Sequence, residues 1–177
     1  MEELQYPIGR FRAPEQVTPA QLKGYINDIR HLPALVEIAV QHLDTWQLDT
    51  PYRPGGWTVA QVVHHLADSH MNAITRFKLA LTEAQPVIKP YDEAAWAGLP
   101  DVTLTPVNVS ITLLHALHTR WVHLLENLSP SDWQKTFVHP EHNAIFDLQT
   151  TAANYAWHGR HHLAHIENTK YEVGGRK

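Results

Sequence analysis

Four long stretches of this chain repeat apolar residues at the spacing of an amphipathic α-helix, and this pattern limits the fold more than any other feature. The stretches begin near Thr18, Thr58, Thr105 and Asp147, and polar segments rich in proline or glycine separate them. Each stretch is roughly 20 residues or longer, which suits one helix of a bundle. The pattern therefore predicts an all-α fold, a four-helix bundle with long inter-helix loops. These long links permit a crossover topology as readily as a simple up-and-down one.

The first two stretches begin with helix-capping signals. Thr18 precedes Pro19, and Gln21 follows at the position that completes a capping box. Thr58 and Gln61 repeat the same spacing at the start of the second stretch. We therefore expect helices to begin directly after Thr18 and Thr58.

Two segments are expected to depart from regular helix. Pro33 lies inside the first stretch, and it should kink or split that helix because proline has no backbone N–H to donate. The segment 135–148, KTFVHPEHNAIFDL, has a mixed pattern before the fourth stretch. It predicts a short strand or hairpin.

The bulk composition fits a single globular domain over residues 1–177, with an N-terminal arm over about residues 1–17. Hydrophobic residues make up 44% of the chain and charged residues 18%. The formal net charge is −4 and no basic stripe is present, which argues against a nucleic-acid partner. No stretch reaches about 18 uninterrupted apolar residues, so no membrane span is expected. The N-terminus lacks a secretory signal pattern, so we expect a cytoplasmic protein.

Histidine is the compositional outlier, with 14 residues in the chain, while cysteine is absent. Any metal site must therefore use histidine and carboxylate ligands. The segment 154–166, NYAWHGRHHLAHI, holds His158, His161, His162 and His165 within eight positions. Chance at this composition places fewer than one histidine in such a window, so the concentration points to a specific role.

Helical geometry ranks these histidines. At about 100° per residue, His158 and His162 lie at the edge of the apolar face of the last helix, whereas His161 points mostly to solvent. Metal sites in bundles use inward-facing residues, so the pair four apart, His158 and His162, is preferred. The same pattern also fits surface or hydrogen-bonded core histidines that bind no metal.

A third ligand must come from another helix, because catalytic zinc sites usually have three protein ligands and an open position. The second stretch offers His64, His65 and His70. His70 lies nearest the centre of its apolar face, His65 at the edge and His64 well outside. Geometry alone leaves the choice open, and a hydrogen-bonded core position for His70 is an equally good interpretation.

Three segments in order, YPIGRF, GGWTVAQVVHHLADSHMNAITRFKLALTE and YAWHGRHHLAHI, together resemble the DinB superfamily over nearly the whole chain. The chain is most similar to the YfiT-like branch, whose members are described as metal-dependent hydrolases and are related to bacillithiol-type S-transferases. The resemblance implies a four-helix bundle with one divalent metal, zinc or nickel, held by His65, His158 and His162. It also implies a cytoplasmic homodimer.

Three neutral imidazoles leave the metal its full divalent charge, which lowers the pKa of a bound water or thiol. No glutamate stands between the paired ligands as it does in zinc peptidases, and Asp68 and Glu141 are only weak candidates for a catalytic carboxylate. A thiolate needs less help from a base than water does, so this favours thiol transfer to a small molecule over hydrolysis. A non-catalytic metal-binding or stress protein is the alternative, with His70, His161 or His165 as a fourth ligand.

Overall fold

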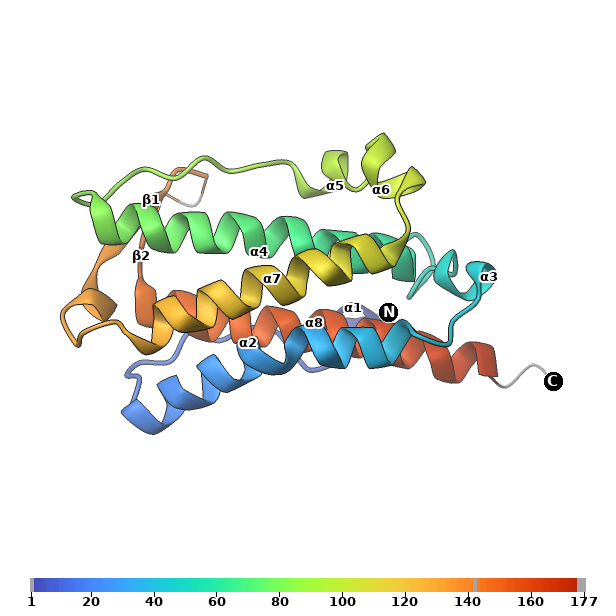
Figure 1. Ribbon diagram of the computed structural model, residues 1–177, viewed down its shortest axis with the longest axis horizontal. Helices are drawn as coiled ribbons and strands as arrows, with labels where there is room; N and C mark the ends of the chain where they lie inside the picture. The colour runs from blue at the N-terminus through green and yellow to red at the C-terminus, as the bar shows by residue number, and fades with distance from the viewer. Residues whose placement is uncertain (1, 142, 175–177) are drawn as a thin grey trace.

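The computed structural model describes residues 2–141 and 143–174, and four long helices dominate it (Figure 1). They are α2 (Pro19–Val40), α4 (Val59–Thr82), α7 (Val107–Glu126) and α8 (Leu148–Gly174). The shorter elements are α1 (Glu2–Gln5), α3 (Thr45–Leu48), α5 (Glu93–Trp96), α6 (Pro100–Leu104), η1 (Asp132–Gln134), β1 (Thr136–His139) and β2 (Ala144–Asp147). The predicted four-helix bundle is confirmed.

The bundle has a crossover topology. Helix α2 packs against α7 and α8, and α4 packs against the same two helices. Consecutive helices α2 and α4 therefore lie across one diagonal, and α7 and α8 lie across the other. Helices α4 and α7 run in the same direction, because the segment between them, which carries α5 and α6, returns along the length of the bundle (Figure 1). Simple up-and-down connectivity is excluded.

The predicted helix starts are confirmed at both capping boxes. The Thr18 and Thr58 side chains accept hydrogen bonds from the backbone N–H groups of Gln21 and Gln61, whose side chains accept from the cap N–H groups in return. Pro33 was expected to kink or split this helix; it does not split it, since α2 continues from Pro19 to Val40. Pro33 is buried, so its packing in the core offsets the missing backbone hydrogen bond.

The segment before α8 forms the expected hairpin. Strands β1 and β2 pair antiparallel, with Phe137 opposite Phe146. Val87 of the crossover segment forms a parallel bridge to Val138, which ties this segment to the same end of the bundle. Among residues 2–141 and 143–174, no helix combines the length and the hydropathy needed to cross a bilayer.

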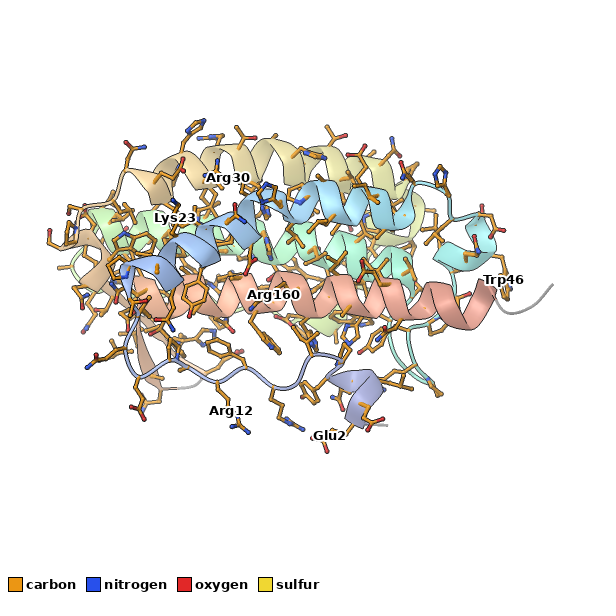
Figure 2. All side chains as sticks on the ribbon, turned by 90° about the horizontal axis from the view of Figure 1, so that it is seen from below. Glu2, Arg12, Lys23, Arg30, Trp46 and Arg160 are labelled. Carbon is orange, nitrogen blue, oxygen red and sulfur yellow. The ribbon has the colours of Figure 1, made fainter. Side chains whose placement is uncertain are left out.

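The N-terminal arm lies along α8 (Figure 2). The indole N–H of Trp157 donates to the carbonyl of Gly9 over 3.2 Å, and a ring nitrogen of His165 lies 3.2 Å from the carbonyl of Gln5. Tyr6 packs against the ring of His161. The arm therefore covers a face of α8 that would otherwise meet solvent.

Candidate metal centre

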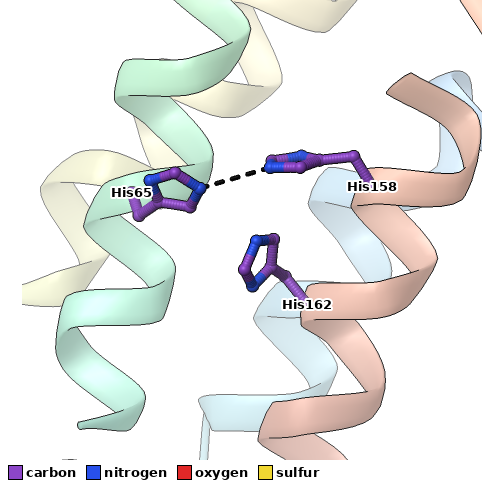
Figure 3. Close-up of side chains that lie close together, drawn as sticks. All are labelled: His65, His158 and His162. Carbon is purple, nitrogen blue, oxygen red and sulfur yellow. Dashed lines mark hydrogen bonds between the residues drawn. The ribbon is translucent and has the colours of Figure 1, made fainter. Parts of the chain in front are cut away.

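Helices α4 and α8 pack side by side and bring three histidines together (Figure 3). His65 comes from α4, while His158 and His162 lie one turn apart on α8. One ring nitrogen from each lies within 4.8 Å of the others, and Nε2 of His65 is 3.2 Å from Nε2 of His158. Two nitrogens bound to one tetrahedral zinc ion would stand about 3.3 Å apart. The three side chains therefore fit a single divalent ion.

Close packing of α8 against α2 turns the paired histidines toward α4. Ala152 and Ala156 are buried on α8, and Gly159 lies so near α2 that an added Cβ would come within 2.7 Å of the Leu32 side chain. Small residues on this side let α8 approach the core closely. His158 and His162 then face His65 across the helix pair.

The three candidate ligands are held in their neutral forms. Burial lowers the pKa of His158 and of His162 well below the usual histidine value, and neighbouring histidines lower it further. Burial, with a smaller effect of His161, lowers the pKa of His65 to about 4. A neutral imidazole has the free lone pair that a metal requires, so the cluster is ready to bind near neutral pH.

The other two histidines considered on α4 are not part of this three-histidine group. Nδ1 of His64 lies 2.7 Å from the Ser110 hydroxyl of α7, away from α8. His70 is fully buried and contacts the rings of His118 and His158, so it is a hydrogen-bonded core histidine. His65 is the α4 histidine that groups with both His158 and His162, and its Nε2 lies 3.2 Å from Nε2 of His158.

His161 and His165 depart from the sequence-based prediction. His161 was expected to point mostly to solvent, but it is 7% exposed because the N-terminal arm and Trp157 cover it. His161, His162 and His165 also form a second group whose ligand atoms lie within 4.8 Å of one another. His162 belongs to both groups, and its Nδ1 lies 3.4 Å from Nδ1 of His165.

Two cavities lie on either side of the His65, His158 and His162 cluster. The larger, about 540 Å³, reaches His158 and has a wall of aromatic side chains together with Arg76 and Tyr155. The smaller, about 340 Å³, reaches His65 and His162 beside the Gly55–Gly56 loop. The larger cavity is within the size range of small-molecule binding sites.

Glu93 is a polar residue of this site that the sequence did not reveal. It begins the short helix α5 in the crossover segment and lines both cavities. Part of its surface is accessible to solvent, yet desolvation raises the pKa of its carboxyl, against the lowering effect of the Arg76 guanidinium. The sequence carries no signal for this placement beyond an acidic residue at a short helix start, because the crossover path alone brings it to the metal cluster.

The two carboxylates that the sequence suggested as catalytic candidates, Asp68 and Glu141, differ in their position relative to the cavities. Glu141 lines the larger cavity together with Glu93. Asp68 lines neither of the two cavities. Burial, with a smaller effect of Asp101, raises the pKa of Asp68 to about 6. Glu93, rather than Asp68, is therefore the carboxylate associated with both sides of the histidine cluster.

Comparisons with known proteins identify the family of this chain. A model of the DinB superfamily matches residues 28–166. A protein of Oceanobacillus iheyensis named "Putative metal-dependent hydrolase" is 54% identical over 161 residues, which cover 91% of this chain and 92% of the relative. A protein of Bacillus mycoides with the same description is 52% identical over 170 residues, covering 96% and 97%.

A solved structure has the same architecture. YfiT from Bacillus subtilis, described as "a probable metal-dependent hydrolase with an unusual four-helix bundle topology", superposes with a TM-score of 0.95 at 45% identity, covering 97% of this chain and 98% of that one. The four-helix bundle with crossover connectivity defines the class, and the chain belongs to the DinB superfamily.

Proposed function

We propose that this protein is a divalent-metal-dependent enzyme that acts on a small molecule, with His65, His158 and His162 as the metal ligands. The observation that carries the proposal is the convergence of three neutral imidazoles, two of them buried and that of His158 part-buried, beside two cavities. When bound, the ion lowers the pKa of a coordinated water or thiol and so supplies a nucleophile near neutral pH. Zinc suits a site of three histidine nitrogens, and nickel is the second choice.

The residues of the larger cavity fit an organic substrate with a polar or anionic group. Phe11, Phe137 and Phe146 supply apolar wall, and Arg76 supplies a positive charge whose guanidinium donates to the Tyr155 hydroxyl over 3.0 Å. Because His158 lines the same cavity, a substrate held here lies directly beside the candidate metal ligands. This arrangement favours chemistry on the bound molecule over simple metal storage.

Thiol transfer is the reaction that we place first. In it, a small thiol forms a carbon–sulfur bond to an electrophilic carbon, the bond from that carbon to its leaving group breaks, and the leaving group departs with the electron pair. The thiol proton passes to Glu93 or to solvent. The protein needs to supply no strong base, because a thiolate is already a good nucleophile.

Hydrolysis is the second candidate, and Glu93 is the observation that favours it. A carboxylate with a raised pKa that lines both cavities next to the histidine cluster is suited to accept a proton from an attacking water. The sequence-based preference for thiol transfer relied on the missing glutamate between the ligands, and Glu93 weakens that reasoning. The names of the Oceanobacillus and Bacillus relatives point the same way.

Parallel assays separate the two reactions. Zinc-loaded and metal-free protein would be tested with a small thiol plus an epoxide or chlorinated electrophile, and with ester and amide substrates. We expect metal-dependent thioether formation, with peptide hydrolysis near background. Metal-dependent hydrolysis without thioether formation would replace the first candidate by the second. Inactivity in both assays, with a fourth protein ligand on the metal, would favour the non-catalytic binding protein.

A homodimer is proposed for the assembly, as the family resemblance implies. Its support on this chain is an exposed apolar surface on neighbouring helices, with Leu35 and Ile38 on α2 and Val109 and Leu113 on α7. The Glu37–His115 contact of 2.9 Å shows that these parts of the two helices lie at the same level. Light scattering should give twice the chain mass for the wild type and the chain mass for Ile38→Glu combined with Leu113→Glu.

A further inference from the structure

Four histidines from three helices form a continuous line of ring-to-ring contacts that begins at the candidate metal centre. His65 Nε2 faces His158 Nε2 at 3.2 Å, and His158 Nδ1 lies 3.2 Å from His70 Nε2. His70 Nδ1 lies 2.8 Å from His118 Nε2. His118 Nδ1 then meets the backbone carbonyl of Ile29 in α2. The line therefore connects a candidate ligand to the backbone of a fourth helix, α2.

The carbonyl at the far end fixes every proton in this line. A carbonyl only accepts, so His118 must carry its proton on Nδ1, and its Nε2 then accepts from His70 Nδ1–H. The same step repeats, so His70 Nε2 accepts from His158 Nδ1–H. His158 Nε2 is left as a bare lone pair that faces His65, which is the form a metal ligand requires.

Pro33 explains why the Ile29 carbonyl is available. In an α-helix this carbonyl would accept from the backbone N–H four residues later, which is position 33. Proline has no N–H, so the carbonyl of Ile29 loses its helical donor inside an otherwise continuous α2. His118 donates to it instead. Because Pro33 lacks an N–H, the Ile29 carbonyl is free to serve as the acceptor at the end of the histidine line.

The surroundings keep water from replacing these contacts. His70 is 0% exposed and His118 is 2% exposed. Trp121 packs edge-on against both rings, and Tyr155 packs edge-on against His70. Burial also lowers the pKa of His118 to about 4 and that of His70 well below the usual value, so both rings remain neutral. His70 and His118 are thus shielded from solvent, and a line of neutral rings that ends on a carbonyl has one consistent arrangement of protons.

We propose that His118 and His70 are positioning residues that hold His158 in the tautomer whose Nε2 lone pair faces the metal, with the Ile29 carbonyl freed by Pro33 as the fixed end of the line. The proposal rests on the metal site proposed above. Outer hydrogen-bond partners of this kind commonly set the orientation and affinity of histidine ligands.

The first test needs no metal. Nitrogen-15 NMR of histidine rings in the metal-free protein should show His118, His70 and His158 all protonated at Nδ1 and bare at Nε2. In His118→Leu, His158 should no longer be held in one tautomer, and its ring-nitrogen signals should shift toward those of a mixture of the Nδ1–H and Nε2–H forms. A wild-type His158 protonated at Nε2 would overturn the proposal, whether or not the protein binds metal.

The second test measures Zn²⁺ affinity by competition with a chromophoric chelator. His118→Leu removes both contacts and should weaken binding by about 10–100-fold. His118→Gln should recover most of the affinity, because the amide N–H₂ can donate to Ile29 while its oxygen accepts from His70. His64→Leu is the matched control, since His64 is a buried histidine on α4 whose Nδ1 contacts Ser110 instead.

Circular dichroism would confirm that each variant is folded before affinities are compared. Equal affinity in wild type and His118→Leu would overturn the proposal, and so would equal losses in His118→Leu and His118→Gln, which would indicate packing alone. A wild type that binds no Zn²⁺ would contradict the proposed function instead, while the NMR measurement would still decide the tautomers.

Discussion

His65 Nε2 and His158 Nε2 lie 3.2 Å apart although 93 residues separate them in the chain. Since the His65 ring is buried, the His158 ring is part-buried and both are neutral, the pair is poised to share one ion. We expect one equivalent of zinc or nickel in protein purified without a nickel column. His65→Ala, His158→Ala and His162→Ala should each lose most of it, whereas His64→Ala should keep it. Equal metal content in wild type and His162→Ala, measured by mass spectrometry, would contradict the proposed ligand set.

Glu93 provides a prediction about proton transfer. Glu93→Gln keeps the shape of the side chain but cannot accept a proton, so turnover should fall by about 10²-fold or more if a base assists the reaction. Metal content should stay unchanged. Glu141→Gln is the matched control, because Glu141 lines only the larger of the two cavities. The fall applies to hydrolysis, in which water needs a base, whereas thiol transfer should change little in Glu93→Gln because a thiolate needs none. A large loss of thiol transfer in this variant would contradict a base-independent nucleophile.

The buried histidines predict that the metal-free protein loses stability in mild acid. Burial lowers the pKa of His65 and His118 to about 4, and shifts His70 in the same direction. Below about pH 6.5 the unfolded chain binds protons that these rings cannot accept in the folded state. Each ring then lowers the free energy of unfolding by up to about 1.4 kcal/mol per pH unit until its folded pKa is reached.

Urea unfolding in the presence of a chelator checks this expectation. The midpoint should be nearly constant between pH 8 and 7 and should fall steeply from pH 6.5 toward pH 5. Bound zinc should shift the loss of stability to lower pH, because it competes with protons for the same nitrogens. A midpoint that is independent of pH across this range would contradict the neutral, buried state of the cluster.

Asp68 predicts the opposite dependence on pH. Burial raises its pKa to about 6, so its ionised form destabilises the folded state as pH rises from about 4 through 6. Asp68→Asn should therefore stabilise the protein by about 1–2 kcal/mol above pH 7, and by less at pH 5. Metal content should not change. A variant that is less stable at pH 8 than the wild type would show that the Asp68 carboxylate makes a favourable contact.

Gly159 predicts a steric coupling between the core and the metal cluster. A side chain at this position meets Leu32 of α2, with an added Cβ only 2.7 Å from its nearest atom. Gly159→Val should cost about 1–3 kcal/mol of stability, because the buried Leu32 has little room to move. The loss of stability in the double variant Gly159→Val with Leu32→Ala should be smaller than the sum of the two single losses. Thermal unfolding of the two single variants and the double variant gives the comparison, and additive losses would contradict the contact.

The sequence by itself determined the local features of this protein. Apolar periodicity and the capping boxes at Thr18 and Thr58 specify helices because these signals act within a few residues. The spacing of His158 and His162 places them on one helix face for the same reason. The choice of His65 over His70 came from resemblance to the DinB superfamily, since both positions fit the apolar face of α4.

Only the tertiary structure decided which distant groups meet. The crossover segment brings Glu93 to the cluster, the N-terminal arm buries His161, and α2 offers the Ile29 carbonyl to His118. Each of these contacts joins residues far apart in the chain, and their energies depend on helix packing rather than on local preference. Pro33 shows the difference most clearly: the loss of its N–H from the hydrogen-bond ladder of α2 could be predicted, but the group that donates to the freed Ile29 carbonyl instead, His118, lies on another helix.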